Sequence, residues 1–201
     1  MRRFDFRWTA GVAGLAVVFT LASRWAFGPL GGQLALLRSG QLWRLLTGPL
    51  VHSNGGQLAR DATAWLVLGA GWEASLGGRF PWLVVLSLAV PTGVVALFKP
   101  EWTAYYGLSG AVYALLTAAF VHEWRVTGGH PPRWMVGTGA ASLLKLLYEA
   151  LTGRLLIPLE LGAGVAPAPL AHVAGVGVGL LLGYGAFARP PRLIAGAAPS
   201  R

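Results

Sequence analysis

The stretch AYYGLSGAVYALL, residues 104–116, places one serine, Ser109, among small and apolar residues in a run without charge. A hydroxyl in an apolar segment needs a hydrogen-bonding partner, because burying an unpaired polar group costs free energy. Gly107 and Gly110 lie on either side of the serine and leave space for another helix to approach closely. The stretch does not match the G-x-S-x-G nucleophile elbow of soluble hydrolases. It therefore predicts a helix inside a membrane with a serine at a close helix contact.

The composition agrees with a membrane environment. Of the 201 residues, 55% are hydrophobic and 11% are charged, whereas a soluble domain carries about 25% charged residues. The formal net charge is +9, but the basic residues are scattered singly, so we expect a lipid bilayer and no nucleic acid as the partner. The absence of cysteine excludes disulfides, thiolate metal sites and a cysteine nucleophile.

Six apolar segments approach the length of about 20 residues that crosses a bilayer. They are residues 8–27, 57–72, 80–98, 106–122, 134–151 and 170–187. Their apolar runs are continuous, which favours helices over a closed barrel. The sequence thus predicts an all-α polytopic membrane protein with a membrane domain at residues 8–187. The first segment follows three arginines and resembles a signal peptide, but it lacks a clear cleavage site, so we expect a retained helix.

The distribution of Lys and Arg predicts the orientation. If the N-terminus is cytoplasmic, nine of the 16 basic residues lie on the inner side, five on the outer side and two within the segments. Cytoplasmic loops carry the excess of positive charge. We therefore expect a cytoplasmic N-terminus at residues 1–7 and a short cytoplasmic tail at residues 188–201.

This topology places Ser109 and His172 at one depth. The segments 106–122 and 170–187 both run inward from the outer face, and each carries one of these residues in its first turn. On the last segment Gly175 and Gly179 are four residues apart and share a face with His172. If this face packs on Gly107 and Gly110, His172 lies beside Ser109. The alternative is a serine bonded to its own backbone and a glycine stripe that serves packing only.

These features resemble the rhomboid family of intramembrane serine proteases. The resemblance rests on GLSG at 107–110, AHVAGVGVG at 171–179 and LWRLLTGPLVHSN at 42–54. It implies a six-transmembrane-helix rhomboid-like bundle and an enzyme that hydrolyses peptide bonds with a Ser-His dyad. In that dyad Ser109 is the nucleophile and His172 the general base. The resemblance also implies that Tyr113 packs on the histidine ring.

A narrower resemblance is to the rhombosortase subgroup. It rests on RDATAWLVLGAGWE at 60–73, KLLYEALTG at 145–153 and VAPAPLAHVAG at 165–175. It implies cleavage of the C-terminal, Gly-Gly-type transmembrane anchors of secreted proteins, near the periplasmic face of a bacterial inner membrane and without a cofactor. Two alternatives remain open: a general rhomboid protease that cleaves single-span membrane proteins, and a non-catalytic rhomboid-like protein that binds membrane segments.

The oxyanion site departs from the family pattern. Many rhomboids carry His-x-x-x-Asn at the start of the second helix, and counting from His52 these positions hold Gln57 and Asp61. Gln57 can donate through its amide, whereas an ionised Asp61 cannot. Asp61 would help only if protonated or if it orients another group. We also expect the backbone N–H groups of Leu108 and Ser109 to be unpaired and to face the oxyanion.

Two further charges fall inside an apolar segment. Lys145 and Glu149 are four residues apart and face the same way on a helix, and Asp61 lies in the same outer half of the bundle. Charges at bilayer depth mark interior pairs or functional sites. We expect an Asp61–Lys145–Glu149 network, either near the site or as a purely structural ion pair. No His, Asp or Glu set has metal-ligand spacing, so no metal site is expected.

Overall fold

The computed structural model describes residues 6–22, 28–156 and 166–184. Within these residues the long helices are α1 Arg7–Leu21, α5 Gly55–Leu76, α6 Phe80–Phe98, α7 Ser109–Val126, α8 Arg133–Thr152 and α9 Pro169–Tyr184. The shorter elements are α3 Leu34–Arg38, α4 Arg44–Thr47 and the 3₁₀ turns Gly48–Leu50 and Gly77–Arg79. Among the described residues the only β-type pairing is a single bridge between Gln33 and Ala104. The predicted all-helical class is confirmed. The predicted tail at 188–201 and most of the N-terminal segment lie outside the described residues.

By length and composition, one helical stretch in the described part of the chain could cross a membrane. It is Gly55–Phe98, which contains α5 and α6 in succession. The helices α1 and α9 are apolar but shorter. The count of six spans therefore stays a prediction.

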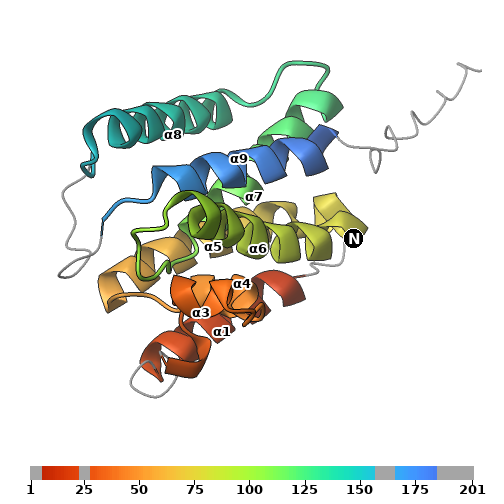
Figure 1. Cartoon of the computed structure of the whole chain (residues 1–201). Helices are drawn as coiled ribbons and strands as arrows, with labels where there is room; N and C mark the ends of the chain where they lie inside the picture. Colours follow the sequence, from red (N-terminus) through yellow and green to blue (C-terminus); the bar gives the residue numbers. More distant parts are fainter. Residues whose placement is uncertain (1–5, 23–27, 157–165, 185–201) are drawn as a thin grey trace, which may run out of the picture.

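The helices form a bundle with α9 and α7 near its centre. Figure 1 shows α8 at one edge and α1, α3 and α4 at the other, with α5, α6, α7 and α9 between them. The most extensive helix contact is between α7 and α9, followed by that between α6 and α9, while α1 packs on α5. The buried core includes Trp65, Phe80, Leu83 and Leu115.

Glycines set the distance between α7 and α9. A Cβ atom on Gly175 would overlap with the carbonyl oxygen of Gly110, and one on Gly179 would overlap with the carbonyl oxygen of Ala114. Gly110 is also confined on its other side, where a Cβ would lie 2.9 Å from Cβ of Pro91 on α6. The two backbones are therefore in direct contact, which is the use that membrane helices make of small residues.

The start of α7 differs from the sequence prediction. The helix begins at Ser109 rather than at residue 106. Gly107 has a φ of 97°, a conformation that residues with a Cβ rarely adopt. A Cβ there would also overlap with the Gln57 amide nitrogen. The chain therefore turns at Gly107 and makes Ser109 the first helical residue.

A buried carboxylate holds the first helix. Glu73 of α5 is 3% exposed and accepts hydrogen bonds from the backbone N–H groups of Trp8 at 3.0 Å and Thr9 at 2.8 Å. The Thr9 hydroxyl donates a third bond, at 2.6 Å. The first N–H groups of a helix have no acceptor within it, and a negative charge at that end is favourable. Glu73 therefore docks α1 onto α5.

We expect Gly175→Ala to destabilise the protein. The new methyl group meets the backbone of Gly110, which cannot rotate away, so the free energy of unfolding should fall by about 1–3 kcal/mol. The matched control is Gly177→Ala on the same helix, where a Cβ would meet nothing within 4 Å and the change should stay within about 0.5 kcal/mol. Thermal denaturation in detergent micelles measures both. Equal melting temperatures for the two variants would contradict the contact.

Candidate active site

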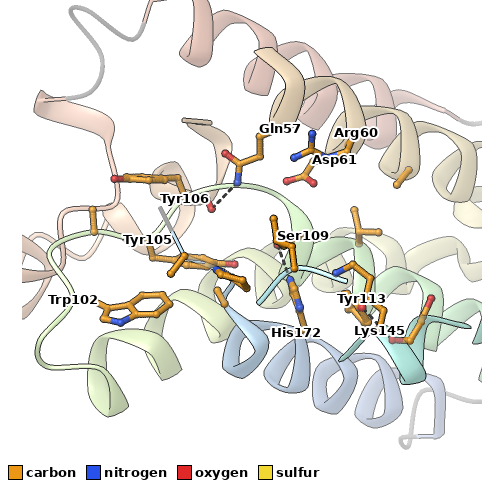
Figure 2. Close-up of a pocket in the computed structure, with 18 of the residues that line it drawn as sticks. Gln57, Arg60, Asp61, Trp102, Tyr105, Tyr106, Ser109, Tyr113, Lys145 and His172 are labelled. Carbon is orange, nitrogen blue, oxygen red and sulfur yellow. Dashed lines mark hydrogen bonds between the residues drawn. The ribbon is translucent and has the colours of Figure 1, made fainter. Parts of the chain in front are cut away.

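The serine and the histidine singled out by the sequence lie in hydrogen-bond contact. Ser109 is the first residue of α7, and His172 lies in the first turn of α9. Its Nε2 is 3.0 Å from Oγ of Ser109, and Figure 2 shows the two side chains pointing toward each other. An imidazole at this distance from a hydroxyl can accept its proton.

Tyr113 holds the imidazole from one side. It lies one turn after Ser109 on α7, and its ring stacks on the ring of His172 with centroids 4.5 Å apart and an interplanar angle of 19°. Its hydroxyl donates to the carbonyl oxygen of Ser142 on α8 at 3.2 Å. Tyr113 therefore contacts both neighbouring helices and limits rotation of the histidine ring.

The pair faces a cavity of about 510 Å³. Gln57, Arg60 and Asp61 of α5 lie across it from His172 (Figure 2). His172 is buried, whereas Ser109 is partly exposed. A polypeptide segment and a water molecule therefore have space to reach the hydroxyl.

Gln57 supports the loop that precedes Ser109. Its Oε1 accepts bonds from the Ser53 backbone N–H at 2.8 Å and the Ser53 hydroxyl at 2.9 Å. Its Nε2 donates to the carbonyl oxygen of Tyr106 at 3.5 Å, a long contact for an amide. Asn54 caps α5 by accepting from the Gln57 backbone N–H at 2.8 Å. The amide group is therefore fixed at the edge of the cavity, where it contacts the carbonyl of Tyr106, two residues before Leu108.

The expectation that the Leu108 N–H is unpaired is wrong. This group donates to Nε2 of His52 at 3.4 Å, because a buried backbone donor without an acceptor would be costly. The other ring nitrogen of His52 lies 3.2 Å from Oγ1 of Thr20 on α1. The N–H of Ser109, as the first residue of α7, has no acceptor within its helix.

The expected Asp61–Lys145–Glu149 network is divided in two. Nζ of Lys145 lies 2.8 Å from Oε2 of Glu149, because the two residues occupy successive turns of α8. Among the described residues, Oδ2 of Asp61 instead lies 3.4 Å from Nε2 of His52, without a hydrogen bond between them. Asp61 belongs to α5, across the cavity, which explains the separation. The sequence pattern did not identify His52 as the partner of either Leu108 or Asp61, since nothing periodic connects these positions.

Tyr105 adds a neutral hydroxyl that the sequence did not single out. It lies in the loop before α7 and is buried, and its N–H donates to the carbonyl oxygen of Gly32 at 2.9 Å. Burial, and secondarily the charge of Asp61, raises the pKa of its phenol, against a smaller opposing effect of Ser109 and Gly110. The phenol therefore stays protonated beside the serine. In the sequence, only its position four residues before Ser109 could have pointed to Tyr105.

The structure defines a bundle of apolar helices with a serine–histidine pair facing a cavity, and comparison with known proteins identifies the family. A family model of the Rhomboid domain matches residues 39–189, most of the chain. The chain belongs to the rhomboid family, and it is therefore an integral membrane protein.

The chain is also similar to the Rhomboid protease GlpG of Pectobacterium atrosepticum. The two are 29% identical over 150 residues, which cover 72% of this chain and 48% of that protein. The chain thus spans about half the length of the curated relative it matches. In the described part of the chain, no group of three or more His, Cys, Asp or Glu residues is placed to hold a metal ion.

We expect His52→Ala to destabilise the protein because it leaves the Leu108 N–H without its acceptor. An unsatisfied buried donor costs about 1–3 kcal/mol, so the melting temperature in detergent should fall. His130→Ala, which changes an exposed histidine, is the matched control and should melt like the wild type. A His52→Ala protein as stable as the control would show that the contacts of His52 are unimportant.

Proposed function

We propose that this chain is an intramembrane serine endopeptidase in which Ser109 and His172 form the catalytic dyad. The observation that carries the proposal is the distance of 3.0 Å between Oγ of Ser109 and Nε2 of His172, at the wall of a cavity inside an apolar bundle. Membership of the rhomboid family supports the same activity, as does the name of the similar protein.

In this mechanism Oγ of Ser109 attacks the carbonyl carbon of the scissile bond while Nε2 of His172 takes the hydroxyl proton. The imidazolium then gives that proton to the leaving amine, and the acyl-enzyme forms. A water molecule from the cavity repeats the sequence and releases Ser109. We assign the Ser109 N–H and the Gln57 amide as donors to the developing oxyanion. Stacking on Tyr113 keeps the imidazole ring of His172 oriented toward Ser109 through both steps.

We place the six long helices across a bacterial inner membrane, with both termini cytoplasmic and the dyad toward the periplasm. The outward side of α8 supports contact with lipid, because its exposed large side chains are mostly apolar. They are Trp134, Val136, Leu143, Leu144, Leu147, Tyr148 and Leu151. A bilayer accepts such a surface, whereas water does not favour a continuous apolar face.

For the substrate we propose the C-terminal, Gly-Gly-type membrane anchors of secreted proteins, as in the rhombosortase subgroup. The support is the sequence of α5, α8 and α9 quoted above, which includes Asp61 on the cavity wall. Cleavage of other single-span proteins is the second candidate, favoured by the similarity to a rhomboid protease over 150 residues. A non-catalytic binder would not need a serine hydroxyl bonded to a histidine.

A fluorophosphonate probe tests the dyad. Wild-type protein in detergent should be labelled, Ser109→Ala should not, and His172→Ala should be labelled at least about 100-fold more slowly, the scale of a lost general base. In-gel fluorescence against time gives the rates. The exposed-site variant His130→Ala should match the wild type. Equal labelling of wild type and Ser109→Ala would overturn the proposed activity.

Co-expression of a secreted reporter tests the substrate. A reporter that ends in a Gly-Gly motif, an apolar helix and a basic tail should be shortened by the wild type and not by Ser109→Ala. A second reporter with the two glycines replaced by leucines keeps the same helix and should stay intact, because leucine side chains fill the space around the scissile bond. Immunoblots and mass spectrometry report both. Equal cleavage of the two reporters would favour the general protease.

A further inference from the structure

Glu149 is an acidic residue whose burial needs an explanation. Its side chain is 0% exposed, while that of its partner Lys145 is 31% exposed. Pairs with this spacing form readily on the outside of a helix, and desolvating a carboxylate is expensive. A structural pair with Lys145 therefore does not require Glu149 to face the interior of the bundle. A second partner on the inner side of α8 would explain why Glu149 faces the interior.

His172 lies on that inner side. Its Nδ1 is 3.8 Å from Oε2 of Glu149. Among the buried side-chain atoms of the described residues, three have no hydrogen-bond partner: Nδ1 of His172, Oε1 of Glu149 and Oδ2 of Asp61. Unpaired buried groups of this kind are rare, because each carries its full desolvation penalty. Oε2 of Glu149 already accepts from Lys145, but a carboxylate oxygen can accept a second donor, and Nδ1 of His172 has no partner.

The dyad itself determines which ring nitrogen carries the proton. Nε2 of His172 must be unprotonated to accept the hydroxyl proton of Ser109 across 3.0 Å. A neutral imidazole then carries its single proton on Nδ1. That proton points to the side of the ring on which Glu149 lies.

We propose that Glu149 is a positioning residue that fixes the proton of His172 on Nδ1 and stabilises the imidazolium during the reaction. The inference rests on the proposed function. Nδ1–H donates to Oε2 of Glu149, which leaves the Nε2 lone pair directed at Ser109. When Nε2 takes the serine proton, the carboxylate faces the new positive charge and remains ionised. The proton leaves from Nε2 to the amine, and Lys145 holds the carboxylate throughout.

The separation of 3.8 Å is longer than the roughly 2.7–3.2 Å of an N–H···O bond. Bonds of catalytic groups are often long without substrate and shorten in the reacting complex. Packing of α8 on α7 and α9 is much less extensive than that of α7 on α9, so a movement of under about 1 Å meets little resistance. Nζ of Lys145 also lies 5.9 Å from the centroid of the Tyr113 ring, so the ammonium is near both the Glu149 carboxylate and the tyrosine that stacks on His172. The other charged groups that line this cavity are Arg60 and Asp61, across it on α5, and Glu101, in the loop between α6 and α7.

Saturation kinetics with the fluorophosphonate probe test the inference. In Glu149→Gln the limiting labelling rate should fall about 10–100-fold, the effect of one charge-assisted hydrogen bond. The probe concentration at half saturation should stay within about 2-fold, because Glu149 does not line the cavity. Glu123→Gln is the matched control: this carboxylate accepts from Nε1 of Trp72 at 3.0 Å and belongs to the far end of α7. Its limiting rate should equal that of the wild type.

A double variant separates positioning from a structural ion pair. Lys145→Met/Glu149→Gln removes both charges and leaves no lysine without its carboxylate partner. If the pair served stability alone, the double variant would regain the wild-type rate, and the inference would be overturned. We expect the low rate of Glu149→Gln to persist. Because this variant is neutral, it gives the answer even where Glu149→Gln alone does not fold.

The tautomer provides a readout that does not depend on labelling. In ¹⁵N spectra of histidine-labelled wild type near neutral pH, the His172 signals, identified by their loss in His172→Ala, should show a protonated Nδ1. A proton on Nε2 would overturn the inference. A wild type labelled no faster than Ser109→Ala would remove the proposed function and this inference together. If the wild type is labelled and Glu149→Gln is labelled at the same rate, the inference is overturned while the proposed function stands.

Discussion

The backbone contact between Gly110 and Gly175 fixes the position of both side chains of the proposed dyad. Ser109 precedes Gly110 by one residue, and His172 precedes Gly175 by three, so one contact between α7 and α9 sets the distance between hydroxyl and imidazole. A methyl group on either glycine would separate the two helices and thereby lengthen the distance between the hydroxyl and the imidazole. Pro91 confines Gly110 from the side of α6. The reactive geometry is therefore a consequence of helix packing, and no flexible loop has to hold it.

The turn before α7 is a second constraint, and it works on the electrostatics of the site. Gly107 takes a positive φ, which ends the loop and leaves the N–H of Ser109 at the start of a helix. Gln57 and His52 hold the preceding residues through the Tyr106 carbonyl and the Leu108 N–H. A donor aimed in advance at the place where charge develops needs no reorganisation during the reaction. In the proposed mechanism, contacts of α5 and of the loop before it thus orient an oxyanion donor that belongs to α7.

The sequence predicted the helices well where apolar runs end at turns. The segment expected at 80–98 coincides with α6, whereas α5 extends past the expected residue 72 because Glu73 is buried against the N-terminus of α1. Depth and glycine spacing were enough to bring His172 to Ser109, since both follow from helical periodicity. The contacts of His52 with Leu108 and of Glu149 with His172 were not predictable. They join single residues far apart in the chain, and no repeat or spacing rule connects them.

The glutamates of the described helices follow one rule with one exception. Glu73 of α5 accepts donors from α1, and Glu123 of α7 accepts from Trp72 of α5, so each carboxylate ties two helices together. Within the described part of the chain, Glu149 bonds only to Lys145 of its own helix, although its side chain is fully buried and lies 3.8 Å from the histidine of α9. A carboxylate that served only to join helices would form a hydrogen bond to the neighbouring helix, as Glu73 and Glu123 do. The missing hydrogen bond between Glu149 and His172 fits a bond that forms when the imidazole becomes charged, because a hydrogen bond between charged groups is stronger than one between neutral groups.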